Sequence, residues 1–112
     1  LVGYQNDQAV AMIQMILKNV DNDPELADGN QIAHLHNLQV RNEFQNQGFG
    51  KEMMVLVERK AKELGKVIIT LGVDDTNHKA ISIYNNLGYI TFKTEPGRTP
   101  DEKCLLMKKE IL

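Results

Sequence analysis

The chain has 112 residues, of which 42% are hydrophobic and 25% are charged, and its formal net charge is −2 at pH 7. These values are typical of one soluble domain, so we expect residues 1–112 to form a single unit, and the mild acidity argues against a nucleic-acid partner. The single cysteine, Cys104, excludes an internal disulfide and a zinc site built from cysteines.

The first predicted elements are two strands, at 1–4 and 9–17, joined as a hairpin by a polar turn. The second is also the longest apolar stretch, and it is too short to span a membrane. No basic-then-apolar leader is present, so we expect a cytoplasmic protein without a membrane partner. Residues 19–31 are polar and predict a loop, whose acidic residues lack the spacing of a calcium site; we expect no metal there.

The middle of the chain predicts a strand, a glycine turn, a helix and a second strand. Residues 32–40 alternate between apolar and polar side chains, which is typical of a strand. Apolar residues then recur every three or four positions over 49–64, which predicts a helix, and Gly65 ends it. Residues 66–73 are a nearly continuous apolar run, which favours a strand covered on both faces. Together these elements predict a parallel βαβ unit.

The last part of the chain predicts a short helix and a closing hairpin. Residues 77–87 have the apolar spacing of a helix that follows cap-forming residues. Strands are predicted at 89–93 and 103–108, and a loop with proline and glycine at 94–101 separates them. Cys104 lies inside the last predicted strand, so we expect a buried, inert thiol rather than a nucleophile.

The turn that opens the central helix is suited to an anionic ligand. Gly48 and Gly50 let the backbone approach a ligand closely, and the N–H groups of a helix's first turn favour phosphate. A dinucleotide fingerprint would need a third glycine at Met53, and a P-loop would need Ser or Thr at Glu52. What remains is Gln45-x-x-Gly48-x-Gly50, which is also compatible with a purely structural turn.

Two motifs resemble one family of enzymes. The glycine turn resembles the Gln/Arg-x-x-Gly-x-Gly/Ala signature of the GNAT superfamily of acetyl-CoA-dependent N-acetyltransferases. A second segment, at 77–89, resembles that superfamily's N-x-x-A-x-x-x-Y-x-x-x-G-[FY] motif. Its matching residues are Asn77, Ala80, Tyr84, Gly88 and Tyr89.

The resemblance implies a GNAT-like fold of the α/β (α+β) class. We therefore expect a mixed, mostly antiparallel sheet around the parallel unit formed by strand 32–40, helix 49–64 and strand 66–73. The short helix 77–87 and the C-terminal hairpin would complete it. Family members open with a further strand and two helices, so the domain is expected to be N-terminally incomplete.

The resemblance also implies a function, the transfer of an acetyl group from acetyl-CoA to a primary amine by direct attack in a ternary complex. The implied cofactor-binding residues are Leu38, Gln39, Val40, Gln45, Asn46, Gln47, Gly48, Phe49, Gly50, Lys51, Asn77 and Tyr84. The first three would pair through their backbone with the pantetheine arm, and residues 45–51 would surround the pyrophosphate. Lys51 either adds charge there or is a solvated lysine, and Asn77 either bonds pantetheine or caps its helix.

The implied catalytic residues are Tyr84 and His34. Tyr84 would protonate the departing sulfur of coenzyme A, the alternative being a tyrosine packed in the core. His34 occupies a position where some family members carry a glutamate base, and His36 shares its face. His34, His36 or a water is therefore the candidate base, against the alternative of a structural, hydrogen-bonded histidine. His78 is expected at the surface.

The implied partners are acetyl-CoA, as co-substrate, and an amine acceptor, which is either a small molecule or a protein amine. The reaction requires no metal, and a homodimer is compatible with the resemblance. The alternative function is a catalytically silent module that binds acyl-CoA for regulation.

Overall fold

The computed structural model describes residues 2–5, 8–17, 31–41, 45 and 48–111. Their secondary-structure elements are, in order, β1 (Val2–Gln5), β2 (Gln8–Ile16), β3 (Ile32–Val40), α1 (Phe49–Glu63), β4 (Ile68–Asp74), α2 (His78–Asn86), β5 (Ile90–Pro96) and β6 (Lys103–Glu110). Most of the loop predicted at 19–31 lies outside the described residues. The acidic residues for which a calcium site was considered lie there too.

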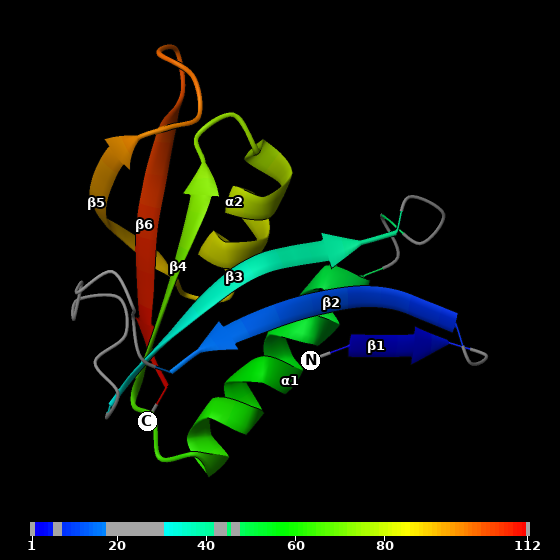
Figure 1. Ribbon diagram of the computed structural model, residues 1–112. Helices are drawn as coiled ribbons and strands as arrows, with labels where there is room; N and C mark the ends of the chain where they lie inside the picture. The colour runs from blue at the N-terminus through cyan, green and yellow to red at the C-terminus, as the bar shows by residue number, and fades with distance from the viewer. Residues whose placement is uncertain (1, 6–7, 18–30, 42–44, 46–47, 112) are drawn as a thin grey trace.

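The strands form one mixed sheet in the order β1-β2-β3-β4-β6-β5. Among the described strands, β3 and β4 are the parallel pair, and the other neighbours are antiparallel. Helix α1 connects the two parallel strands (Figure 1). The predicted N-terminal hairpin, central βαβ unit, short helix and C-terminal hairpin are all confirmed.

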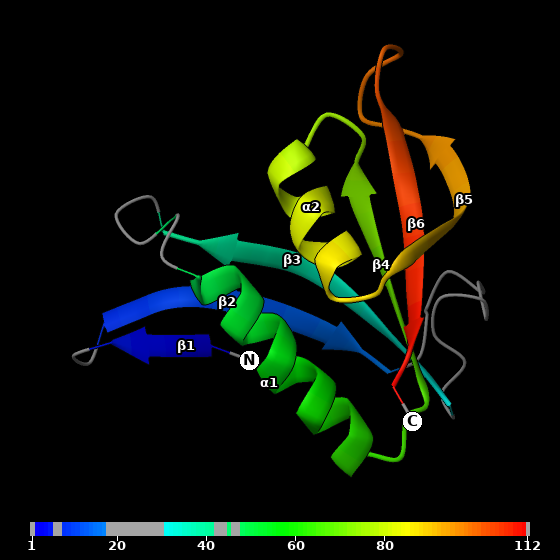
Figure 2. The ribbon, with the colours of Figure 1, turned by 180° about the vertical axis from the view of Figure 1, so that it is seen from behind.

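Both helices cover the same face of the sheet, as the opposite views of Figures 1 and 2 show together. The core lies between this face and the helices, and strand alternation selects its residues. On β4, for example, Ile69, Leu71 and Val73 are buried in the core, whereas Gly72 lies on the opposite face. The buried core residues are Ala11, Ile13, Leu35, Met53, Met54, Val57, Ala61, Ile69, Leu71, Val73, Tyr84, Tyr89, Met107 and Ile111.

Each helix ends at a glycine in the left-handed region, Gly65 (φ 80) after α1 and Gly88 (φ 98) after α2. After α1, the N–H of Lys66 donates to the carbonyl of Ala61 at 2.9 Å, and the N–H of Gly65 donates to that of Lys62 at 3.0 Å. This pair of bonds is the Schellman motif, and the same pair closes α2. The predicted stop at Gly65 is therefore confirmed.

The prediction of a loop over the whole of 94–101 was wrong. β5 continues to Pro96, and residues 94–96 pair with Leu105, Cys104 and Lys103 of β6. The error has a physical reason. β5 is an edge strand with mostly exposed side chains, so no apolar alternation marks it, and proline is tolerated on an edge.

Candidate active site

The parallel strands β3 and β4 separate after a short ladder. Their last pair is Leu35 with Leu71, although β3 continues to Val40 and β4 to Asp74. Beyond this pair each strand stays bonded only to its outer neighbour among the described strands, β2 for β3 and β6 for β4. Figure 1 shows the two strands diverging toward their carboxyl ends. The inner edge of β3 over 36–40 is thus available to an extended ligand.

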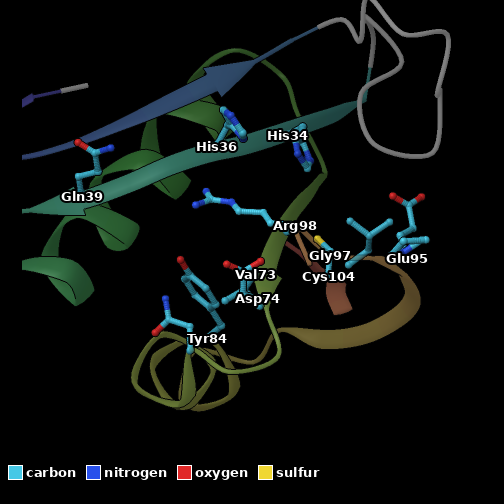
Figure 3. Close-up of a pocket in the computed structure, with 14 residues that line it drawn as sticks. His34, His36, Gln39, Val73, Asp74, Tyr84, Glu95, Gly97, Arg98 and Cys104 are labelled. Carbon is cyan, nitrogen blue, oxygen red and sulfur yellow. The ribbon is translucent and has the colours of Figure 1, made fainter. Parts of the chain in front are cut away.

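A pocket of about 630 Å³ lies where the strands diverge (Figure 3). It brings together side chains that are far apart in the sequence. His34 and His36 come from β3, Asp74 from β4, Tyr84 from α2, and Arg98 from the turn between β5 and β6. The structure therefore places both predicted catalytic residues, Tyr84 and His34, on the wall of one pocket.

Tyr84 is buried, with 6% of its surface exposed, and its ring meets that of Tyr89 edge to face at a centroid distance of 6.0 Å. Figure 3 shows its hydroxyl directed toward the pocket. Burial raises the pKa of Tyr84 above its ordinary value of 10.0. The phenol therefore keeps its proton at neutral pH, as a proton donor must. The ring is packed in the core while the hydroxyl faces the cavity.

His34 is also buried, and its position is fixed by a partner that the sequence did not indicate. Its Nδ1 shares a hydrogen bond of 2.9 Å with Oγ1 of Thr70, the residue opposite it in the β3–β4 ladder. Thr70 is itself 1% exposed. His36 is exposed, lines the same pocket and lies on the same side of β3, as predicted. His78 is exposed, which confirms its predicted surface position.

The start of α1 is open to a ligand. Gly48 caps the helix in the left-handed conformation (φ 83), and no side chain of a described residue caps it. The N–H of Glu52 donates to the carbonyl of Gly48 at 3.0 Å and begins the helical ladder, so the N–H groups of Gly50 and Lys51 precede that ladder. A Cβ added at Gly48 would meet nothing within 4 Å. The glycine is therefore required by its φ angle and not by a contact of a described residue at its Cβ position.

The sequence matches the model of one protein family. The acetyltransferase (GNAT) family model covers residues 1–89. The chain belongs to the GNAT family of acetyltransferases. The resemblance carried by the two motifs is thereby confirmed.

Solved structures share the fold of this GNAT domain. An aminoglycoside 6′-N-acetyltransferase complexed with coenzyme A has a TM-score of 0.78 and 19% identity, covering 99% of this chain and 71% of that one. The ribosomal-protein-S18-alanine N-acetyltransferase from Escherichia coli has a TM-score of 0.73 and 24% identity, covering 96% and 65%. The aminoglycoside 6′-N-acetyltransferase from Enterococcus faecium has a TM-score of 0.78 and 19% identity, covering 99% and 73%. At these identities the likeness concerns the fold alone.

Asn77 of the GNAT domain caps α2. Its Oδ1 accepts the N–H of Ala80 at 3.2 Å, so the capping alternative is present in the structure. The residue also lines the pocket, so a contact with pantetheine stays a prediction.

Neither described helix of the domain is long and apolar enough to cross a membrane.

The remaining predicted cofactor-binding residues are described unevenly. Gln39 lines the pocket, and Gln45 and Lys51 are exposed beside the start of α1. For Leu38 and Val40 the structure describes the β3 backbone and not the side chains. The predictions for residues 46 and 47 (Asn46 and Gln47) fall outside the described residues.

The prediction that Cys104 is buried was wrong. It is half-buried and lines the pocket, because β6 turns Met107 toward the helices and Cys104 toward the other face. Burial raises the pKa of the Cys104 thiol, and the carboxylates of Asp74 and Glu95 raise it further, while a backbone hydrogen bond from Val73 lowers it. The thiol is therefore a weak nucleophile at neutral pH.

Proposed function

We propose that this GNAT domain transfers an acetyl group from acetyl-CoA to a primary amine by direct attack in a ternary complex. The observation that carries the proposal is the separation of β3 and β4 beyond Leu35 and Leu71, with a pocket at the gap that contains Tyr84. The amine nitrogen attacks the thioester carbonyl, the C–S bond breaks, and the amine loses a proton while the sulfur gains one.

The acetyl-CoA site in this proposal extends along β3 to the start of α1. The backbone of Leu38, Gln39 and Val40 pairs with the pantetheine arm as an added strand would, and an N–H there holds the oxyanion of the tetrahedral intermediate. The diphosphate lies at residues 45–51, where the amides that precede the helical ladder and the charge of Lys51 favour an anion. The lack of a side-chain cap on α1 among the described residues supports this placement.

Tyr84 is the proposed general acid. Its hydroxyl faces the pocket, and burial holds its pKa above 10.0, so it is protonated when the thiolate leaves. An ordinary thiol has a pKa about 1.5 units below that of an ordinary phenol, and burial in the pocket disfavours both anions, so proton transfer from Tyr84 to the departing sulfur is feasible.

The proposed general base is His34, with His36 or a water as alternatives. If Nδ1–H of His34 donates to Thr70, Nε2 carries the lone pair that a base needs, and the ring is held by the 2.9 Å hydrogen bond. His36 is exposed on the same wall, and its ring has no such hydrogen-bond partner among the described residues. We favour His34 because an oriented base loses less entropy on reaching the reactive geometry.

The first test is binding. Acetyl-CoA at about 100 times its Kd should stabilise the protein by about 2.7 kcal/mol, which a thermal shift detects, whereas NAD and ATP should give none. The second test is turnover, measured as release of the coenzyme A thiol in the presence of an amine panel. Binding without release would support the silent acyl-CoA module instead.

A cytoplasmic location and a homodimer also stand as proposals. Cell fractionation tests the location, and light scattering tests the homodimer.

A further inference from the structure

Arg98 projects into the pocket from the turn between β5 and β6. Figure 3 shows its guanidinium between the histidines of β3 and Tyr84 of α2. Its side chain is exposed, and among the described residues it forms no ion pair. A guanidinium held at a cavity in this way is available to a ligand.

The turn that carries Arg98 is tightly built. The N–H of Gly97 donates to the carbonyl of Glu102 at 2.9 Å, and the N–H of Glu102 donates to that of Thr99 at 3.2 Å. A Cβ added at Gly97 would lie 2.7 Å from the backbone carbonyl of Glu102, so only glycine fits. The turn that presents Arg98 to the pocket is therefore closed by backbone hydrogen bonds on both sides of that residue.

The other charges of the pocket are partly neutralised. Glu95 pairs with Lys93 at 3.8 Å, and Figure 3 shows its carboxylate directed away from Arg98. Asp74 ends β4 and lines the pocket, and among the described residues it forms no ion pair. Among the described residues of the pocket wall, Asp74 and Arg98 are thus the carboxylate and the guanidinium that form no ion pair.

We infer that the acceptor is zwitterionic, a primary amine with a carboxylate or phosphate a few bonds away. Arg98 binds the anionic group through its planar fork, and Asp74 attracts the ammonium before it is deprotonated. A polycationic acceptor or a simple alkylamine would leave the Arg98 guanidinium without an anionic partner. This inference rests on the proposed function and specifies its substrate class.

The test compares acceptors in matched pairs. β-Alanine is paired with its amide, 4-aminobutyrate with butylamine, and O-phosphoethanolamine with ethanolamine, and kcat/KM is measured by thiol release. The anionic member of a pair should exceed its neutral partner by about 10- to 100-fold, the factor expected of a hydrogen bond to a charged group. The first two pairs test a carboxylate and the third tests a phosphate, so the larger ratio identifies the preferred anion.

Variants of Arg98 locate the source of that preference. In Arg98→Gln the ratio within each pair should fall close to one, and Arg98→Lys should restore part of it. The matched control is Arg59→Gln, because Arg59 is an exposed arginine on α1 that does not line the pocket, and its ratios should equal those of the wild type. A urea melt of each variant confirms that it is folded.

Three results would overturn the inference, and only the last of them also overturns the proposed function. If neutral or polycationic amines match the anionic ones, or if Arg98→Gln keeps the wild-type ratio, the zwitterionic class is wrong and the transferase stands. If acetyl-CoA binds but no acceptor releases its thiol, the proposed function fails and the inference fails with it.

Discussion

The two helices begin in different ways. α2 starts at Asn77, whose side chain accepts a hydrogen bond from the N–H of Ala80. One N–H group of the first turn of α2 therefore has its partner within the protein. α1 starts at Gly48, which has no side chain to offer, and among the described residues none takes its place. An uncapped helix start costs stability unless water or a ligand completes it. The difference supports the proposal that an anionic ligand completes the start of α1, whereas α2, which carries Tyr84, needs no ligand at its start.

The two helix starts therefore have separable consequences. Changes at the start of α1 should affect acetyl-CoA binding as well as folding. Changes at the start of α2 should affect folding first, while changes at Tyr84 itself should affect the chemical step. Matched pairs of residues in this chain allow each statement to be tested.

The largest effect is expected for Tyr84→Phe. Loss of a general acid lowers kcat by about 10²- to 10⁴-fold, while the packed ring is retained, so acetyl-CoA binding should change little. Because burial raises the pKa of Tyr84 above 10.0, the wild type should show no loss of this acid below pH 10.0. Steady-state kinetics and a thermal shift with acetyl-CoA measure the two effects. Full turnover in the variant would remove Tyr84 from the mechanism.

The next effect is expected for Gly48→Ala. The left-handed conformation costs an alanine about 1–2 kcal/mol of stability, and the new methyl group enters the open space proposed for the diphosphate. Gly65→Ala is the matched control, because Gly65 has nearly the same φ (80), equally open surroundings and a position at the far end of α1. Both variants should lose similar stability in urea melts.

Only Gly48→Ala should also weaken acetyl-CoA binding, by about tenfold or more, in an isothermal titration of the folded variants. Equal affinity in the two variants would show that the left-handed turn at Gly48 serves the fold alone. It would also contradict the placement of the diphosphate at the start of α1.

Local sequence signals predicted most of the fold, because periodicity and glycine act over a few residues. The helix over 49–64 and its stop at Gly65 were recognised from such signals and are present at Phe49–Glu63 and Gly65. The strand over 94–96 was missed because an exposed edge strand needs no apolar pattern. Its pairing partners in β6 lie several residues further along the chain.

The candidate site was only partly predictable, for a different reason. Tyr84 and His34 came from motif position, and the structure brings them to one pocket. Thr70 and Arg98 could not have been found in the same way. Thr70 reaches His34 through the register of two parallel strands, and Arg98 reaches the pocket through a turn whose shape depends on close backbone contact.

A smaller effect is expected for Asn77→Ala. Loss of the cap should lower the free energy of unfolding by about 1 kcal/mol, and Asn77→Ser should restore most of it, because a serine hydroxyl also accepts an N–H. The measurement is a urea melt of both variants beside the wild type. If the affinity for acetyl-CoA also falls in Asn77→Ser, whose stability is restored, then Asn77 contacts the pantetheine arm as well. If it does not, capping is the whole role.

The smallest effect concerns the contact that joins the end of α2 to α1. The Tyr89 hydroxyl donates to Glu58 Oε1 at 3.0 Å, and Lys109 Nζ donates to the same oxygen at 3.0 Å. Tyr89→Phe removes one of these bonds and should lower the free energy of unfolding by about 0.5–1.5 kcal/mol at neutral pH. Lys109 still compensates the Glu58 carboxylate, so the loss stays small.

The pH dependence of stability separates this contact from simple packing. Burial, and then Glu58, raise the pKa of Tyr89 above its ordinary value of 10.0. Its contribution is therefore complete below pH 10.0 and is lost as the pH rises above that value, where the unfolded chain releases the proton and the folded chain retains it. Tyr89→Phe should lose stability less steeply than the wild type above pH 10.0, by up to about 1.4 kcal/mol per pH unit. Because Lys109 and Tyr84 are present in both proteins, parallel curves would mean that Tyr89 ionises equally easily in the folded and unfolded chains.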